Sequence, residues 1–254
     1  MTWATRRRII VVSILSLMVA GIFSGTFYLF AHKTPTCTDG VQNQKEEGVD
    51  CGGTCPYLCS ISQAPPSVRF VRPVSPSPGR TDVVAYIDNP NPTAGVRNLH
   101  YTIELYSPTN AVVATKEGET DLPPTATMPV FVPNFFSGSS EVSRAFITFD
   151  EATLKWFTYK DERIIPLVRS TDITPGDQPR ITALVENPSA ERLSNVKFVI
   201  TVFGADGNAM AASQTIAPSI PPQGTANLIF TWSKPFASTP SRVEVLPIVP
   251  IPGI

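Results

Sequence analysis

Hydrophobic and polar positions follow two different patterns along this chain, and the first is an unbroken apolar run near the N-terminus. Ile9 to Phe30 is a stretch of 22 residues without a charged side chain. An α-helix rises about 1.5 Å per residue, so this stretch is about 33 Å long and can cross a hydrocarbon core of roughly 30 Å. Because it is apolar on every face, we expect a transmembrane helix over residues 9–30 rather than a helix of a soluble domain.

The second pattern, beyond residue 68, is an alternation of apolar and polar residues in short runs. Apolar side chains occupy every second position at Leu99, Tyr101, Ile103 and Leu105 and, less regularly, at Val196, Phe198, Ile200 and Val202. A period of two residues is typical of a β-strand with one face against a core. Asn-Pro, Pro-Pro and Asp-Gly turn signals separate the runs. We therefore predict six or seven short strands in each stretch of about 95 residues.

The alternating region also contains a long internal repeat. Residues 84–90 match residues 182–188 at an offset of 98, and residues 98–106 match residues 195–203 at an offset of 97. A repeat of this length indicates two copies of a whole domain rather than a solenoid. We expect a mainly β chain with a cytoplasmic segment at 1–8, a transmembrane helix at 9–30, a disulfide-rich module at 34–60, a linker at 61–67, and two tandem immunoglobulin-like β-sandwiches at 68–160 and 161–254.

Charge determines the expected orientation of the helix. Arg6, Arg7 and Arg8 precede the apolar run, and only His32 and Lys33 follow it before a series of acidic residues. The positive-inside rule places the N-terminus in the cytoplasm and the remainder in an extracellular or periplasmic compartment, as in a single-pass plasma-membrane protein. A cleaved signal peptide is the alternative. Its apolar core is shorter and ends at small residues, whereas this run ends in Tyr-Leu-Phe.

All four cysteines lie within 23 residues, at Cys37, Cys51, Cys55 and Cys59. An even number of clustered cysteines outside a membrane predicts two disulfides, because so short a segment does not bury a core of its own. Three pairings are open. A zinc site of four thiolates is the alternative, but the spacing lacks two Cys-x-x-Cys knuckles and the expected compartment is oxidising.

The residues between the cysteines form the pattern C-x-D-G-x-x-N-x-x-E-x-G-x-D-C-G-G-x-C over residues 37–55. This segment resembles a short cysteine-rich module that recurs in bacterial and archaeal surface proteins. It departs from that module at its end, where Cys59 falls one residue later than the usual spacing. The resemblance implies an exported protein and does not imply an activity.

The same segment holds four oxygen-bearing side chains within twelve residues, at Asp39, Asn43, Glu46 and Asp50. Hard oxygen ligands in such number suit calcium, which takes six to eight of them. The alternative is that these side chains stabilise tight turns, and the spacing is not that of an EF-hand. The sequence therefore marks a candidate calcium site and leaves the turn interpretation open.

The sandwich region carries motifs of two families. Asn-Pro-Asn-Pro at 89–92, the alternating strand after it and Leu-Pro-Pro at 122–124 resemble the water-stress and hypersensitive-response domain of type 2 late-embryogenesis proteins. The Leu-Tyr pair at 105–106, a polar turn and Val-Val at 112–113 are similar to the bacterial FxLYD-type sandwich. The second copy retains Glu-Asn-Pro at 186–188 but lacks the second Asn-Pro. The resemblances imply a fold and not a shared role.

Composition and motifs point away from catalysis and nucleic-acid binding. The formal net charge is −1, without the basic excess of a nucleic-acid-binding protein. His32, at the membrane edge, and His100, expected to point away from a core, have no nucleophile nearby in a recognisable motif. We expect no catalytic residues and no cofactor other than the candidate calcium. Trp156, Phe157 and Tyr159 are expected to form an interdomain core, with a ligand surface as the alternative.

The sequence thus favours a non-catalytic envelope protein that displays two sandwiches for binding or structural support. Its expected partners are the lipid bilayer, through Ile9–Phe30, and an unidentified protein or glycan. Gly21 and Gly25 form a small-xxx-small pair that permits homodimerisation of the helix. The alternatives are a subunit of a larger membrane assembly and a stress-protection or apolar-ligand-binding protein.

Overall fold

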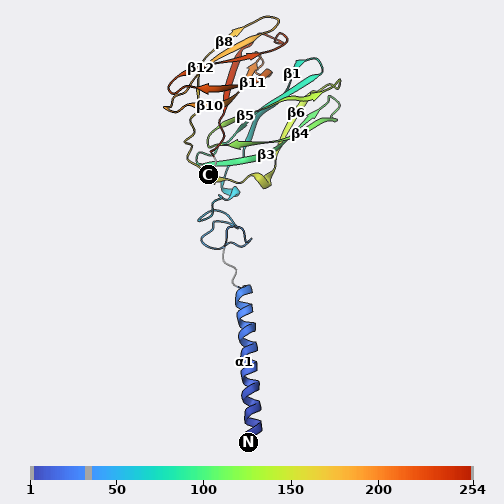
Figure 1. The fold of residues 1–254 in the computed structure, drawn as a ribbon. Coiled ribbons are helices and arrows are strands. Elements are labelled where there is room, and N and C mark those ends of the chain that lie inside the picture. Colours follow the sequence, from blue (N-terminus) through green and yellow to red (C-terminus); the bar gives the residue numbers. More distant parts are fainter. Residues whose placement is uncertain (1–2, 32–35, 253–254) are drawn as a thin grey trace. The chain divides into compact units, whose positions relative to one another are not determined.

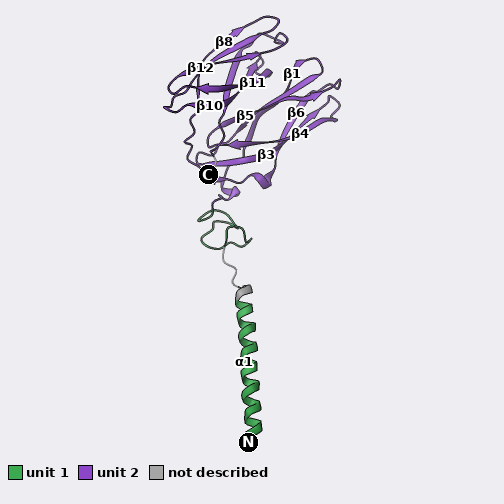
Figure 2. Ribbon diagram, in the orientation of Figure 1, with its two compact units in different colours: residues 1–55 green, residues 56–254 purple. Residues whose placement is uncertain are grey.

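The computed structural model describes residues 3–31 and 36–252, so His32 and the expected module boundary at residue 34 lie outside the described residues. The chain divides into two compact units, Met1–Cys55 and Pro56–Ile254 (Figure 2). The expected disulfide-rich module at 34–60 is therefore divided after Cys55, and both expected sandwiches fall within the second unit.

The first unit begins with helix α1, Trp3–Ala31, which is 29 residues long (Figure 1). Within its segment Trp3–Tyr28, the most apolar window of 18 residues has a mean hydropathy of 2.3, and protein buries none of that window. The helix confirms the predicted apolar helix over residues 9–30. It begins earlier than the apolar run and includes the three arginines that precede that run. Nothing in the described structure lies within 4 Å of a side chain added at Gly21 or Gly25, so homodimerisation through this pair stays a prediction.

The second unit consists of antiparallel strands and two 3₁₀ turns, Ser60–Ser62 and Glu151–Thr153. The strands are β1 (Ser67–Ser77), β2 (Arg80–Asp88), β3 (Ala94–Tyr106), β4 (Val112–Leu122), β5 (Thr127–Ser137), β6 (Arg144–Phe149), β7 (Phe157–Thr158), β8 (Leu167–Thr174), β9 (Arg180–Glu186), β10 (Leu193–Phe203), β11 (Ala209–Ile220), β12 (Thr225–Thr231) and β13 (Arg242–Ile248).

Strand pairing follows the same scheme in both halves of the second unit. β2 lies between β1 and β5, and β3 lies between β4 and β6, with the short β7 attached to β3. Correspondingly, β9 lies between β8 and β12, and β10 lies between β11 and β13. Each half therefore has two antiparallel sheets that enclose a core, which confirms the predicted mainly β fold of sandwich type.

Alternation along the long central strands sorts side chains between a core face and an outer face, as predicted. The fully buried members are Leu99, Ile103 and Leu105 of β3, and Phe198, Ile200 and Val202 of β10. Each set packs with residues of the opposite sheet in its own half. Full burial of one such side chain stabilises the fold by about 1.5–3 kcal/mol, so these strands anchor the two cores.

A third apolar layer joins the two halves, and we call it the seam. Strand β2 is buried on both faces: Val83 and its alternate neighbours point into the first core, while Val84 and Tyr86 point the other way. Strand β10 likewise turns Val199 and Phe203 away from the second core. The seam thus lies between sheet β1–β2–β5 and sheet β11–β10–β13. Its buried residues are Val74, Val84, Tyr86, Val199, Phe203 and Ala212.

Polar contacts complete the seam. The Tyr86 hydroxyl donates a hydrogen bond of 3.0 Å to Oγ1 of Thr201, which is itself fully buried. Burial raises the pKa of Tyr86, so its hydroxyl remains a protonated donor. At the margin of the seam, Oγ of Ser233 donates to the backbone carbonyl of Pro76 at 3.2 Å. The second unit is therefore held together by apolar packing reinforced with hydrogen bonds.

The connection between the halves contains a partly buried ion pair. The Arg163 side chain is only 4% exposed and pairs with Asp161 through two contacts of 2.7 Å. Hydrogen bonds from Arg163 lower the pKa of Asp161. The same guanidinium donates to the carbonyl of Val249, so the connection is fastened to the segment that follows β13.

The aromatic residues near the connection do not form the expected interdomain core. Trp156 is 1% exposed and belongs to the core of the first sandwich, where its carbonyl accepts the N–H of Leu58 at 2.8 Å. Phe157 is half-buried, and the guanidinium of Arg97 lies 4.7 Å from its ring centroid. Packing between the halves comes from the seam instead, because β2 and β10 offer apolar side chains on both faces.

Candidate functional site

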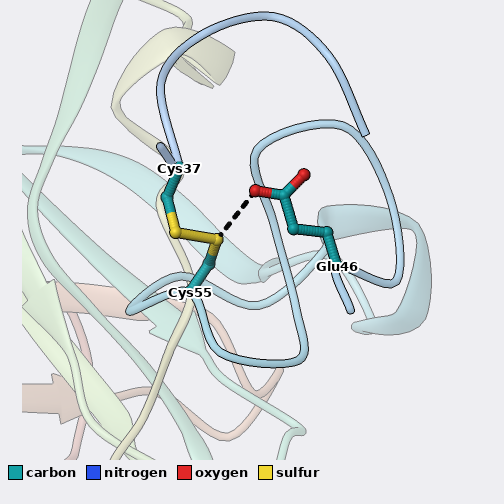
Figure 3. Close-up of side chains that lie close together, drawn as sticks. All are labelled: Cys37, Glu46 and Cys55. Carbon is teal, nitrogen blue, oxygen red and sulfur yellow. Dashed lines mark hydrogen bonds between the residues drawn. A yellow bond between two sulfur atoms is a disulfide. The ribbon is translucent and has the colours of Figure 1, made fainter. Parts of the chain in front are cut away.

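Cys37 and Cys55 form a disulfide with an S–S distance of 2.01 Å and a Cα–Cα distance of 5.6 Å (Figure 3). Cys51 and Cys59 are also disulfide-bonded, and none of the described cysteines is free. The predicted disulfides are confirmed, and a zinc site of four thiolates does not fit, because the sulfur atoms are oxidised. A disulfide that closes a loop of this length stabilises the folded module by about 3 kcal/mol.

The carboxylates of the module accept hydrogen bonds from the backbone. Asp50 accepts the N–H of Asp39 at 3.0 Å and that of Gly40 at 2.9 Å. Asp39 in turn accepts the N–H of Val41 at 2.9 Å and the side-chain amide of Asn43 at 3.0 Å. Each carboxylate thus satisfies donors that an irregular loop leaves without a strand or helix partner.

Glu46 has the same role and is the most buried of the four, at 7% exposure. Its Oε2 accepts the N–H groups of Asn43 and Asp50, both at 3.2 Å. The turns around it need glycine: Gly53 has φ +60°, and a Cβ there would lie 1.9 Å from the carbonyl oxygen of Lys45. These contacts support the turn-stabilising interpretation of the motif.

Calcium binding by Asp39, Asn43, Glu46 and Asp50 stays a prediction. Among the described residues, the group of three His, Cys, Asp or Glu ligand atoms that converge within 4.8 Å is Cys37, Glu46 and Cys55. The other two carboxylates do not converge with Glu46 in this way. The module therefore shows separate backbone-bound carboxylates rather than a cage of oxygens around one point.

Figure 3 shows the Glu46 carboxylate turned toward the disulfide, with Oε1 at 3.1 Å from Sγ of Cys55. A disulfide sulfur has no hydrogen, so this is a contact between a carboxylate and a polarisable sulfur atom. As ligands for a metal, the two sulfurs would first have to be reduced to thiolates. While the disulfide is intact, a negative charge beside Cys55 disfavours the thiolate that reduction would create.

The Asn-Pro motif has a structural role in the first sandwich. Asn89 is 2% exposed, and its amide nitrogen lies 2.8, 3.2 and 2.9 Å from the carbonyl oxygens of Ala94, Leu122 and Pro123. An amide has two hydrogens, so one of them is shared. Its Oδ1 accepts the backbone and side-chain N–H groups of Asn91, both at 3.0 Å. The side chain thus joins the end of β2 to the start of β3 and the end of β4.

The second sandwich repeats this arrangement around Asn187, which is fully buried. Its amide nitrogen donates to the carbonyls of Glu191, Ile220 and Pro221, and its Oδ1 accepts from the backbone and hydroxyl of Ser189. A serine therefore replaces the second asparagine of the motif without loss of the contacts. The motif is explained by the fold and offers no group for chemistry.

His100 points away from the core, as predicted, and its side chain is 57% exposed. Its Nε2 lies 3.8 Å from the carboxylate of Glu119, which is 65% exposed. Two solvated groups at this distance interact weakly. The expectation that the protein is not an enzyme stays a prediction.

Sequence reasoning missed a groove beside the seam, which we call the seam groove. It has a volume of about 640 Å³ and opens where β5 of the first half faces β11 and the end of β12 of the second. Its polar lining includes Arg80 and Asp82 from the first half and Gln178, Arg180, Ser213 and Gln214 from the second. These residues lie far apart in the sequence, so no local pattern marks them as one site.

No known family model matches this sequence, and comparison with curated proteins gives no match. The resemblances to a surface-protein module and to two sandwich families therefore stay predictions. What the fold itself defines is a class: a protein with one N-terminal apolar helix, a small disulfide-bonded segment and antiparallel sheets of sandwich type.

Proposed function

We propose that this protein is a non-catalytic envelope protein that is anchored by α1 and holds two β-sandwiches outside the cytoplasm. The observation that carries the proposal is the bare apolar surface of α1. Ile10, Leu15 and Phe23 are 52%, 56% and 76% exposed, and the other large apolar side chains described along the helix are similarly uncovered. Apolar surface in water costs about 25 cal/mol per Å², so insertion of this helix into a bilayer is energetically favourable.

The charges and the cysteines support the orientation. Arg6, Arg7 and Arg8 lie at the N-terminal end of α1 without an acidic residue in its first turn. Disulfides persist in oxidising compartments, and those of this chain follow the helix. Both features agree with an N-terminus in the cytoplasm and sandwiches in an extracellular or periplasmic space.

The role of the sandwiches is presentation. Because the seam buries apolar side chains of both halves, the second unit offers its surfaces in one fixed geometry rather than as two independently moving domains. We propose that this pair of sandwiches contacts a protein or a glycan of the cell envelope.

Two reporters, each with one added cysteine, test the anchor and its orientation in the full chain. Ser140→Cys places a thiol in the exposed loop between β5 and β6, and Ala4→Cys places one at the N-terminal end of α1. On intact cells, we expect a membrane-impermeant maleimide to label Ser140→Cys and to label Ala4→Cys only after lysis. The wild-type chain, whose cysteines are oxidised, is the control for background labelling.

Three results would contradict the proposal. Reversed labelling would overturn the orientation. Release of the chain from membranes by alkaline carbonate would show that α1 does not anchor it in the bilayer. A mature protein whose mass lacks the first thirty residues would show that the apolar run is a cleaved signal peptide.

A further inference from the structure

The geometry points to a ligand for the seam groove: we propose that it binds an oligosaccharide that carries carboxylate groups. The inference rests on the proposed function, because it places the groove where envelope glycans occur, and it names the partner class. A volume of about 640 Å³ falls within the usual range of ligand pockets. The seam fixes the two walls of the groove relative to each other, so the site is formed before any ligand arrives.

The first step is the hydrogen-bonding capacity of the walls. Gln178, Ser213, Gln214 and Thr231 line the groove, and their side chains make no hydrogen bond within the described part of the chain. Amides and hydroxyls of this kind offer both donors and acceptors. A saccharide presents hydroxyls that both donate and accept, so it can satisfy such a set along its length.

The second step is charge. Arg80 and Asp82 form a bidentate pair at 2.9 and 3.1 Å, and Asp82 also accepts the N–H of Asn134 at 2.7 Å, so both of its oxygens are engaged. Arg180, the first residue of β9, is exposed and has no ion pair or hydrogen bond among the described residues. The groove therefore presents one uncompensated guanidinium. A guanidinium binds a carboxylate through two parallel hydrogen bonds, which selects an acidic sugar over a neutral one.

The third step is the exclusion of an extended peptide. A peptide that adds to a sheet edge needs a row of free backbone N–H groups. The wall formed by β5 carries Pro133, and Pro129 lies further along the same strand; neither has an N–H, and prolines at an edge oppose strand addition. Side chains, rather than the backbone, are the groups available on this wall. That arrangement favours a ligand recognised through its hydroxyls and carboxylates.

The test uses the full chain in lipid nanodiscs and two trisaccharides, trigalacturonic acid and maltotriose, titrated by calorimetry. We expect saturable binding of trigalacturonic acid and weaker binding of maltotriose. Arg180→Gln should weaken binding of the acidic trisaccharide at least about tenfold and leave maltotriose unchanged, because one charge-assisted contact is lost. Gln214→Ala should weaken both. Lys160→Gln, which removes an exposed positive charge outside the groove, is the matched control and should change neither.

Two outcomes would overturn the inference. One is the absence of a specific response, which means no saturation by either trisaccharide at millimolar concentration or equal effects of Arg180→Gln and Lys160→Gln on binding. The other is tighter binding of an acidic hexapeptide of Ala and Glu that Gln214→Ala abolishes, which would assign the groove to a peptide. Circular dichroism confirms that the variants are folded. Reporter labelling at Ser140→Cys is independent of sugar binding, so failure of the groove and failure of the anchor are distinguishable.

Discussion

Replacing Asn89 by Ala tests whether a buried amide holds together the end of the first sandwich. The substitution removes the donor shared by three carbonyls at 2.8–3.2 Å and the acceptor of two N–H groups of Asn91 at 3.0 Å. Each buried polar group left without a partner costs about 1–3 kcal/mol. Because some of the five groups have other partners, we expect a loss of about 3–5 kcal/mol, which is a large part of the roughly 5–15 kcal/mol that stabilises a typical domain.

Urea unfolding of the full chain in detergent micelles, followed by tryptophan fluorescence, measures this loss, because Trp156 lies in the affected core. Asn227→Ala is the matched control: Asn227 is exposed on β12 and should change stability by less than about 0.5 kcal/mol. Asn187→Ala should be as damaging as Asn89→Ala, because it has equivalent contacts. A midpoint for Asn89→Ala that equals that of the control would refute the reasoning.

Three further predictions concern other parts of the structure. Tyr86→Phe leaves the buried Thr201 hydroxyl without its partner and should lower the free energy of unfolding by about 1–3 kcal/mol, as measured by urea unfolding. Asp161 has a lowered pKa because Arg163 donates hydrogen bonds to it. Its contribution to the free energy of unfolding is therefore present above the ordinary pKa of 3.8 and is lost as the pH falls through the pKa of the folded state. Asp161→Asn should flatten the fall in melting temperature over that acidic range. Gly53→Ala places a methyl group 1.9 Å from a backbone oxygen and should slow oxidation of the four thiols, which mass spectrometry after alkylation measures. Gly40→Ala is the control: a methyl group there has open space around it and should slow oxidation less.

The sequence was sufficient to predict the strands whose two faces differ. Leu99 to Leu105 alternate cleanly because the outer face of β3 is polar, and the structure buries the expected side chains. β10 alternates less regularly because Val199 and Phe203 are needed in the seam. The apolar run of β2 has the same origin. A strand buried on both faces loses the alternation of apolar and polar residues, so the irregular patterns of β2 and β10 indicated a second buried interface, the seam.

The candidate site was less predictable, because its geometry depends on residues that local patterns do not connect. The pairing of Cys37 with Cys55 does not follow from spacing, since four cysteines allow three arrangements. The oxygen-rich motif predicted either calcium or turns, and the observed contacts are with backbone N–H groups. The seam groove combines Arg80 with Arg180, which only the packing of two sandwiches brings to one place. Sequence patterns thus predict elements more readily than the surfaces between them.

The seam has one further consequence, for self-assembly. It joins sheet β1–β2–β5 of the first half to sheet β11–β10–β13 of the second half, which has a different place in the strand order. This is a head-to-tail contact, and contacts of this kind are able to propagate into open filaments. The outer face of β3 is polar, with His100, Thr102 and Glu104, whereas the outer face of sheet β12–β9–β8 is mixed, with Leu184 between Thr182 and Glu186 on β9 and with Ile173 and Ile229 exposed on its neighbours. The polar face of β3 disfavours the stacking of a further sheet at that end, and replacing its polar residues with the Val and Tyr of β2 would promote head-to-tail association.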